Sequence, residues 1–318
     1  MEYRYIRRGP KSLEIDLEES PELFSNEVEW LGDFARNKFF RIPKDYKLNG
    51  HPKYLNGRVI GMDAASVATV WALRIDESST KSVLDMCCAP GMKLMVIKDF
   101  LSGGLVGTDV SENRLRVCRN LLMKYGYTDL VDSGGLWLKN KDDGELVPFS
   151  RIVEGSKKRK SFAKRQKSLK TIAFPKKFDR VLVDAECTHD GSDRHESKHE
   201  GFWSQVGTAK NRVFYNTEEK LAGLIENQKK FICEGFEFLE KGGLMVYSTC
   251  SLQSRQNEEV VEFLLEKFKD TAQLNELPFK LIEDGGTVPA KRVFGKCCLF
   301  DPATSGTSGQ FIACIRKI

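Results

Sequence analysis

Residues 83–93 read VLDMCCAPGMK, an apolar run that breaks at Ala89-Pro90-Gly91. Residues 94–101 continue as LMVIKDFL, with apolar side chains at helical spacing. The pattern predicts a strand, a tight turn and a helix. In a doubly wound sheet, the crevice at the carboxyl end of the first strand binds nucleotide-like ligands against the N-terminus of the following helix. We therefore expect a ligand at this turn.

Predicted strands and helices alternate from residue 81 onward, which indicates an α/β fold with a mostly parallel sheet and helices on both faces. The predicted strands span 83–86, 105–109, 136–138, 178–184, 244–248 and 311–315. The last of them is expected to be antiparallel, at or near an edge of the sheet. The predicted helices span 94–101, 113–125, 217–239 and 258–268.

Residues 1–60 mix charged and aromatic side chains and are expected to form a small, mainly helical region before the α/β domain of 61–318. A helical face predicts one helix over 21–37. A second, buried helix is predicted over 65–73, with Asp63 or Ser66 as its cap.

The composition, 41% hydrophobic and 30% charged over 318 residues, is typical of a soluble globular protein. No apolar run approaches the roughly 20 residues that span a bilayer, and the first residues lack the apolar core of a signal peptide. We expect an intracellular protein without membrane association. The nine cysteines, an odd count in a long chain, are expected to be reduced thiols.

The basic charge is concentrated in residues 156–170, which read SKKRKSFAKRQKSLK and carry eight Lys or Arg and no acid. Since the net charge of the chain is +5, the rest of the chain is net acidic. The run lies in an insertion at 150–173 between two predicted strands. It suits a nucleic-acid-binding loop, a nuclear-import signal at 157–160, or a solvated loop. Nucleus and cytoplasm both stay open.

Four of the predicted strands end in polar or thiol side chains, which the parallel edge of a sheet would bring together. These are Asp85 with Cys87, then Asp109, then Asp184 with Cys187, and then Cys250. An acid that closes the second strand often binds ribose hydroxyls, although an acid also caps helices. The turn is not G-x-G-x-x-G, so a nucleoside cofactor without a pyrophosphate, such as S-adenosylmethionine, is favoured over a dinucleotide.

Two cysteines are candidate nucleophiles, because Cys187 and Cys250 each follow an apolar strand at the expected ligand crevice. Buried, unreactive roles are expected for Cys87, Cys118, Cys233 and Cys314. A zinc site from Cys187, His189, His195 and His199 is the alternative, but the set lacks a second Cys or C-x-x-C spacing. We expect no metal, and we place the histidines in loops near the substrate or in solvent.

With these residues in place, the sequence resembles the Sun/RsmB-like RNA cytosine-5 methyltransferases. The motifs that carry the resemblance are the turn at 85–93, DAECT at 184–188, STCS at 248–251, GMDAAS at 61–66, and FDP at 300–302 with SGQFIA at 308–313. Together they extend from about Gly61 to Lys317. The resemblance implies the Rossmann-like methyltransferase fold and S-adenosylmethionine as the cofactor.

The resemblance also implies which residues bind the cofactor. These are Cys87, Cys88, Ala89, Pro90, Gly91, Met92, Lys93, Asp109, Arg114, Asp143 and Asp184. Asp142 is the alternative to Asp143 as the acid of the third strand. Lys93 is expected to bridge the cofactor turn to Asp184.

By the same resemblance, Cys250 attacks carbon 6 of a cytosine, Asp184 holds the edge of the base, and Cys187 helps to release the enzyme. The expected substrate is a tRNA or rRNA, and the expected protein is a monomer. Glu186 and Thr188 depart from the family pattern beside Cys187, and we expect the Glu186 charge to raise the pKa of that thiol. This departure motivates the alternative of an RNA-binding assembly factor with little or no activity.

Overall fold

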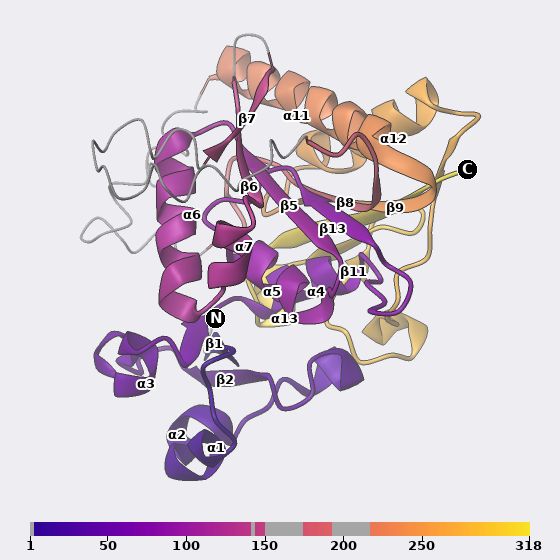
Figure 1. Cartoon of the computed structure of the whole chain (residues 1–318). Coiled ribbons are helices and arrows are strands. Elements are labelled where there is room, and N and C mark those ends of the chain that lie inside the picture. Colours follow the sequence, from indigo (N-terminus) through magenta and orange to yellow (C-terminus); the bar gives the residue numbers. More distant parts are fainter. Residues whose placement is uncertain (1–2, 141–143, 150–173, 193–216) are drawn as a thin grey trace, which may run out of the picture.

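A ten-stranded sheet forms the centre of the computed structural model, which describes residues 3–140, 144–149, 174–192 and 217–318 (Figure 1). Its strands are β4 (Ser82–Asp85), β5 (Gly104–Asp109), β6 (Leu136–Lys139), β7 (Leu146–Pro148), β8 (Phe178–Asp184), β9 (Leu239–Thr249), β10 (Ala272–Leu274), β11 (Lys291–Arg292), β12 (Cys298–Phe300) and β13 (Gln310–Lys317). The order is β11-β12-β13-β9-β8-β4-β5-β6-β7, and β10 pairs with β13.

The five central strands, β6-β5-β4-β8-β9, are parallel, while β13 runs antiparallel to β9. The chain leaves β4 toward β5 on one side and returns to β8 on the other, so the strand order reverses at β4. A crevice opens at the carboxyl ends of the strands at such a switch point. The predicted antiparallel last strand is thus confirmed. The predicted mostly parallel sheet is observed as a parallel core of five strands within a mixed sheet, which has antiparallel strands on both sides of that core. β13 lies inside the sheet, because β12 and β10 both pair with it on the side away from β9, and β11 pairs with β12 beyond.

Helices cover both faces of the sheet, as predicted (Figure 1). On one face lie α4 (Ala64–Trp71), α5 (Met92–Phe100), α6 (Glu112–Tyr125) and the short α7 (Thr128–Asp132). On the other lie α11 (Glu218–Phe238) and α12 (Glu258–Lys267). Asp63 caps α4 as expected, since its side chain accepts a hydrogen bond from Ala65 N at 3.0 Å. Within the described ranges, we find no helix with both the length and the apolar character that a bilayer span requires.

The N-terminal region is organised by a three-stranded antiparallel sheet, β2-β1-β3, that the prediction of a mainly helical region missed. Its strands are β1 (Tyr3–Arg8), β2 (Phe39–Pro43) and β3 (Val59–Gly61). The helices around this sheet are short: α1 (Ile15–Glu19), α2 (Pro21–Phe24), η1 (Glu29–Phe34), η2 (Leu48–Gly50) and α3 (Pro52–Leu55). Pairing between distant segments, which local periodicity does not report, builds this region.

The single helix predicted over 21–37 is wrong, because α2 ends at Phe24 and the chain then pairs with β2. Val28 N donates to Phe39 O at 3.0 Å, and Asn26 O accepts from Arg41 N at 2.8 Å. Gly32, at φ +53°, breaks the following η1 segment. The apolar residues 28, 31 and 35 are still buried, so the pattern located the buried face correctly but not the backbone.

A buried arginine ties the N-terminal sheet to α5. Arg7 in β1 is 1% exposed and pairs with the carboxylate of Asp99. Its guanidinium also donates to Tyr127 Oη at 2.6 Å, and that hydroxyl donates to Asp99 Oδ1 at 2.7 Å. A charge in such a dry place is stable only when it is paired, so the two parts of the chain are locked together here.

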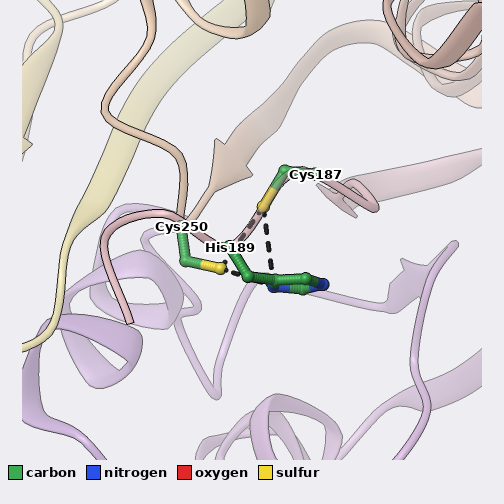
Figure 2. A group of neighbouring side chains, drawn as sticks. All are labelled: Cys187, His189 and Cys250. Atoms are coloured by element: carbon green, nitrogen blue, oxygen red, sulfur yellow. Dashed lines mark hydrogen bonds between the residues drawn. The ribbon is translucent and has the colours of Figure 1, made fainter. Parts of the chain in front are cut away.

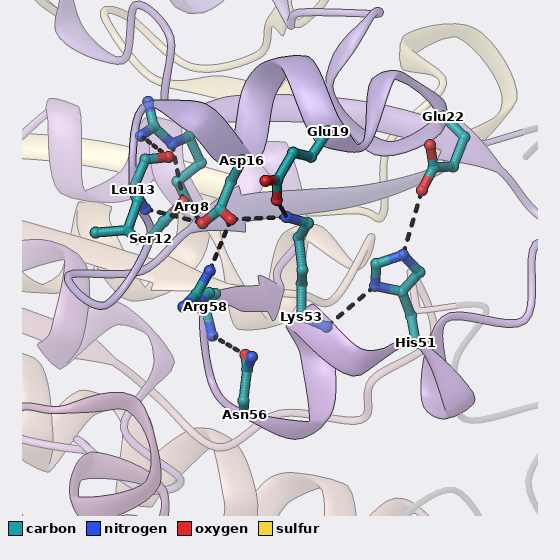
Figure 3. Close-up of polar contacts among 10 residues, drawn as sticks. All are labelled: Arg8, Ser12, Leu13, Asp16, Glu19, Glu22, His51, Lys53, Asn56 and Arg58. Carbon is teal, nitrogen blue, oxygen red and sulfur yellow. Dashed lines mark hydrogen bonds and ion pairs between the residues drawn. The ribbon is translucent and has the colours of Figure 1, made fainter.

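A second buried charge, Asp16, organises the N-terminal region internally (Figure 3). Its carboxylate accepts hydrogen bonds from Lys53 Nζ at 2.7 Å, Arg58 Nη1 at 2.9 Å and Leu13 N at 2.8 Å. Lys53 also reaches Glu19, at 3.2 Å. Burial by itself opposes ionisation, but these donors outweigh it and hold the pKa of Asp16 well below its usual range.

We expect Asp16→Asn to lower the free energy of unfolding by about 2 kcal/mol or more, because Lys53 and Arg58 lose the charge that they share. Asp33→Asn is the matched control, since Asp33 pairs with Arg36 at the exposed surface. That control should cost less than about 1 kcal/mol. Urea unfolding of both variants measures the difference, and equal losses would contradict the role of Asp16.

The stability that Asp16 contributes also depends on pH. Its pKa is depressed in the folded protein, so the contribution is fully present above the unfolded-state pKa of about 4. It is lost as the pH falls toward the folded-state pKa. The gap in unfolding free energy between the native protein and Asp16→Asn should therefore narrow below about pH 4.

Candidate active site

The carboxyl ends of β4, β5, β8 and β9 bring the predicted site residues to one edge of the sheet. Asp85 ends β4, Asp109 ends β5, Asp184 ends β8, and Cys250 follows β9 directly. The parallel register places Asp184 beside Ser248. The prediction that these residues share one edge of the sheet is therefore confirmed.

The turn between β4 and α5 packs tightly against its neighbours. Cys88, Ala89 and Gly91 are buried, whereas Cys87, Pro90, Met92 and Lys93 are half-buried. Gly91 caps α5 at φ +105°, and a Cβ there would lie 2.9 Å from Cys118 Sγ, so both the backbone and the space require glycine. Burial raises the pKa of the Cys87 and Cys88 thiols well above the usual range, so neither is a nucleophile.

Two acids at this edge are buried without full compensation. Neither carboxylate oxygen of Asp85 has a hydrogen-bond partner within the described part of the chain, and the same holds for Asp109 Oδ2. Burial, helped by the charge of Asp184, raises the pKa of Asp85 to about 8. Burial also raises the pKa of Asp109, although Arg114 opposes it. Buried acceptors without donors are costly, so they suit a ligand that brings donors or positive charge.

Arg114 supports the turn from α6. Its guanidinium lies 3.4 Å from Asp109 Oδ2 and also donates to the carbonyl of Ala89. It thus connects the end of β5 to the turn that follows β4. The third-strand acid, whether Asp143 or Asp142, lies outside the described residues, as do His195, His199 and the basic insertion at 150–173.

The expected bridge between Lys93 and Asp184 is present, with Nζ 2.7 Å from Oδ2. Burial disfavours the charged amine, but Asp184 more than offsets this and raises the pKa of Lys93. Gln310 Nε2 donates to the other carboxylate oxygen at 3.4 Å and also to Ser248 Oγ. Asp184 is therefore held from both sides at the centre of the crevice.

Two cysteines and a histidine form a compact group beside this bridge (Figure 2). Cys187 Sγ lies 3.3 Å from Cys250 Sγ, and His189 Nδ1 lies 2.9 Å from Cys250 Sγ and 3.7 Å from Cys187 Sγ. All nine cysteines are free, as expected. Cys187 is fully buried and Cys250 is half-buried, so Cys250 is the more accessible of the two sulfurs.

The two thiols share a proton unequally. The Cys250 thiol donates to Cys187, which, together with burial, raises the pKa of Cys250 well above its usual range. Burial opposes ionisation of Cys187 too, but the bond from Cys250 and the charge of His189 lower its pKa well below the usual value. Burial likewise disfavours the imidazolium of His189, yet the Cys187 charge raises the pKa of the ring. The trio thus favours an imidazolium beside a singly deprotonated thiol pair.

The expectation that Glu186 raises the pKa of Cys187 is wrong. The Glu186 side chain points to solvent and is exposed, so its charge does not offset the donors around the sulfur. Its field acts instead on His189, where it helps to raise the pKa of the ring. A residue next in sequence on an extended segment points to the other side of the backbone, which a sequence argument from proximity overlooks.

The loop that carries His189 is tied to the segment after Cys250. Asp190 accepts from Ser251 Oγ at 2.8 Å and from Leu252 N at 3.0 Å. Gln256 accepts from Thr188 N at 3.1 Å. These contacts fix the backbone on both sides of His189.

Reasoning from the sequence underrated three residues of this site: His189, Gln310 and Gln256. His189 lies two positions after Cys187, but no sequence pattern indicates that its ring points at Cys250 rather than at solvent. Gln310 lies in the C-terminal motif at 308–313, whereas nothing in the sequence marked Gln256. The ligand atoms of Cys187, His189 and Cys250 lie within 4.8 Å of one another, and the described residues add no fourth ligand of a tetrahedral zinc site to this group. His195 and His199 of the alternative zinc set lie outside the described residues.

Comparisons with known proteins agree with this geometry. A family model described as 16S rRNA methyltransferase RsmB/F matches residues 156–316, half of the chain. Ribosomal RNA small subunit methyltransferase F of Serratia proteamaculans is 25% identical over 279 residues, which cover 87% of this chain and 48% of that protein. The tRNA (cytosine(49)-C(5))-methyltransferase of Pyrococcus abyssi is 27% identical over 271 residues, 83% of this chain and 72% of that one.

A crystal structure of a methyltransferase homolog protein from Pyrococcus horikoshii superposes with a TM-score of 0.64 and 23% identity, over 100% of this chain and 87% of that one. This likeness bears out the predicted Rossmann-like methyltransferase fold. The chain spans about half the length of the ribosomal RNA methyltransferases F that it matches.

The loop that carries His189 makes a close backbone contact at Gly191 with Gly309, so a methyl group added at residue 309 should lower stability. A Cβ on Gly309 would lie 2.8 Å from Gly191 Cα and 2.9 Å from Leu252 Cδ2. Gly309→Ala should therefore push the loops apart and lower the free energy of unfolding by about 1–3 kcal/mol. Gly223→Ala in α11 is the control, because its Cβ meets nothing within 4 Å. Denaturant titration should show that the control is at least as stable as the native protein; a neutral Gly309→Ala would contradict the close contact.

Proposed function

Because the chain belongs to the 16S rRNA methyltransferase RsmB/F family, we propose that it transfers a methyl group from S-adenosylmethionine to carbon 5 of an RNA cytosine. The observation that carries this proposal is the position of two thiols, 3.3 Å apart, at the edge where Lys93 bridges the cofactor turn to Asp184. A methyl acceptor site and a cofactor site then share one crevice.

The thiols answer the chemical difficulty of the reaction. Carbon 5 of cytosine is a weak nucleophile, and a covalent bond at carbon 6 turns it into an enamine that accepts a methyl group. Cys250 is assigned this attack because it is the more accessible sulfur, and Cys187 assists release from beneath it. Asp184 holds the N3 and amino edge of the base, where charge builds up on attack. The target base must leave its stack to reach these groups.

The uncompensated acids of the crevice support S-adenosylmethionine as the methyl donor. When bound, this molecule supplies an electrophilic methyl group on a sulfonium, together with an amine and ribose hydroxyls. Asp109 suits the hydroxyls, and Asp85 suits positive charge, because Oδ2 of Asp109 and both carboxylate oxygens of Asp85 lack hydrogen-bond donors within the described residues. The turn at 87–93, with Gly91 at its bend, would hold the rest of the ligand.

An RNA substrate, tRNA or rRNA, is supported by the names of the relatives, one acting on ribosomal RNA and one on tRNA. The eight basic residues of 156–170 would add phosphate contacts. The alternative, an assembly factor without activity, is not favoured. Its motive was the loss of a usable Cys187, and the exposed Glu186 does not impair that thiol.

We expect Cys250→Ala to abolish methyl transfer and to keep S-adenosylmethionine affinity, because this thiol faces the base rather than the cofactor turn. Cys187→Ala should accumulate a covalent protein–RNA adduct, seen as a band that resists denaturant, because release fails after attack. Cys233→Ala is the control. Cys233 is a buried residue of α11 away from the crevice, so this variant should keep turnover. Normal turnover by Cys250→Ala would overturn the assignment, and an adduct with Cys250→Ala instead would reverse the two roles.

Asp85 makes cofactor binding pH-dependent. With a pKa of about 8, Asp85 is mostly protonated in the free protein at pH 7 and ionises when a cation binds beside it. We expect S-adenosylmethionine binding to release a proton at pH 7, measured by calorimetry in buffers of different ionisation enthalpy. Asp85→Asn should abolish this release and weaken binding. A binding enthalpy that does not vary with the buffer in the native protein would contradict the link.

A further inference from the structure

The imidazole of His189 is the one group of the thiol cluster to which the proposed mechanism gives no role. Its Nδ1 contacts both sulfurs, at 2.9 Å from Cys250 and 3.7 Å from Cys187 (Figure 2). The inference that follows rests on the proposed function. It concerns which residue makes the thiol pair reactive.

His189 is held in an unusual backbone conformation. Its φ is +58°, in the left-handed region that non-glycine residues seldom adopt. Such strain costs on the order of 1 kcal/mol or more and persists only where the surroundings impose it. Here the contacts of Thr188 with Gln256 and of Asp190 with Ser251 impose it. The result aims the ring at Cys250, and strain of this kind is typical of residues that take part in function.

The surroundings of the ring favour a cation at this place. The carboxylates of Glu186 and Asp184 act on His189 in addition to the sulfurs. Lys93 is the cation that faces the group from the α5 side, but it is paired with Asp184. The net field at the ring is therefore negative, and His189 is the natural counter-charge for a thiolate.

We propose that His189 acts as an imidazolium that keeps the Cys187 and Cys250 pair singly deprotonated, and so prepares Cys250 to attack the base. Its Nδ1–H donates to the Cys187 thiolate, at 3.7 Å. The one remaining proton lies between the two sulfurs, 3.3 Å apart. Cys187 thereby accepts the proton of Cys250 in the native protein. In Cys187→Ala, His189 still lies 2.9 Å from Cys250 Sγ and supports a Cys250 thiolate directly, so attack proceeds and release is the step that fails.

The proton and electron count of the step is complete. As Cys250 Sγ bonds to carbon 6, its proton passes to the Cys187 thiolate, and the electron pair of the double bond between carbons 5 and 6 forms the bond from carbon 5 to the methyl group. The electron pair of the broken methyl–sulfonium bond would stay on that sulfur, which leaves as a neutral thioether. Loss of the carbon 5 proton to water then restores the double bond and breaks the bond between carbon 6 and sulfur. Cys187 returns its proton to the departing Cys250. His189 keeps its proton throughout.

His189→Asn tests the inference, because asparagine tolerates the left-handed backbone but carries no charge. His189→Gln is a second neutral variant, and His51→Asn, in the N-terminal region, is the matched control. The rate of Cys250 alkylation by iodoacetamide, followed by peptide mass spectrometry across a pH series on the full chain without RNA or cofactor, reports the thiolate. Both His189 variants should lose about tenfold in rate at pH 7, with a profile moved upward by a unit or more. The control should match the native profile.

Methyl transfer separates this inference from the proposed function. The His189 variants should lower kcat, leave the KM for RNA and the affinity for S-adenosylmethionine unchanged, and recover activity as the pH rises. A shifted alkylation profile in a protein that never methylates RNA would support the thiol–imidazole pair and refute the proposed function. If the pH profile of Cys250 alkylation in a folded His189 variant matched that of the native protein, the role of His189 would be overturned. With four histidines in the chain, NMR titration of the native protein gives a third measurement, and a His189 pKa at or below about 6.5 would also overturn it.

Discussion

The ion pair between Lys93 and Asp184 is the interaction on which the crevice depends. Lys93 lies in the first turn of α5, after β4, and Asp184 ends β8, so the 2.7 Å contact joins the two sides of the switch point. Both charges lie in a poorly hydrated place, where either one alone would be costly. The pair therefore fixes the distance between the turn that would hold a cofactor and the loop that carries the thiols. Gln310, from β13, holds the same carboxylate and brings the antiparallel strand into this arrangement.

Reasoning from the sequence performed well where the signal was local or followed from sheet topology. The strand at 178–184 and the helix cap at Asp63 are observed as predicted. The meeting of Cys187 with Cys250 followed from parallel strands that end at one edge, whereas the bridge between Lys93 and Asp184 was expected from the family resemblance. The family resemblance drawn from the motifs at 85–93, 184–188 and 248–251 is confirmed by the family match, which covers the two later motifs. These features can be predicted from the periodicity of apolar residues, the residues of a turn and the order of the strands.

The features that reasoning from the sequence missed depend on contacts between distant segments or on the direction of a side chain. The N-terminal sheet pairs residues 3–8 with 39–43 and 59–61, and a helical face over 21–37 competes with that pairing and loses. The strand at 298–300 has too few residues for a period to show. Glu186 and His189 flank Cys187 at one and two positions, yet the first points to solvent and the second toward Cys250. Their directions come from the loop conformation, which no periodic pattern encodes.

Two buried aspartates, Asp16 and Asp85, both pay the free-energy cost of removing a carboxylate from water, but the structure compensates them differently. Asp16 meets three strong donors, so its desolvation is offset and its pKa falls. Among the residues that the structure describes, Asp85 meets no such donors, and its pKa rises to about 8. If Asp16 and Asp85 only stabilised the fold, we would expect hydrogen-bond donors or cations beside each of them, because an unpaired buried carboxylate lowers stability at any pH where it ionises. The difference is therefore informative: the uncompensated acid stands at the end of β4, where the strand order reverses. A cationic ligand at that strand end would add positive charge beside Asp85 to that of Lys93, which already opposes the rise in the pKa of Asp85.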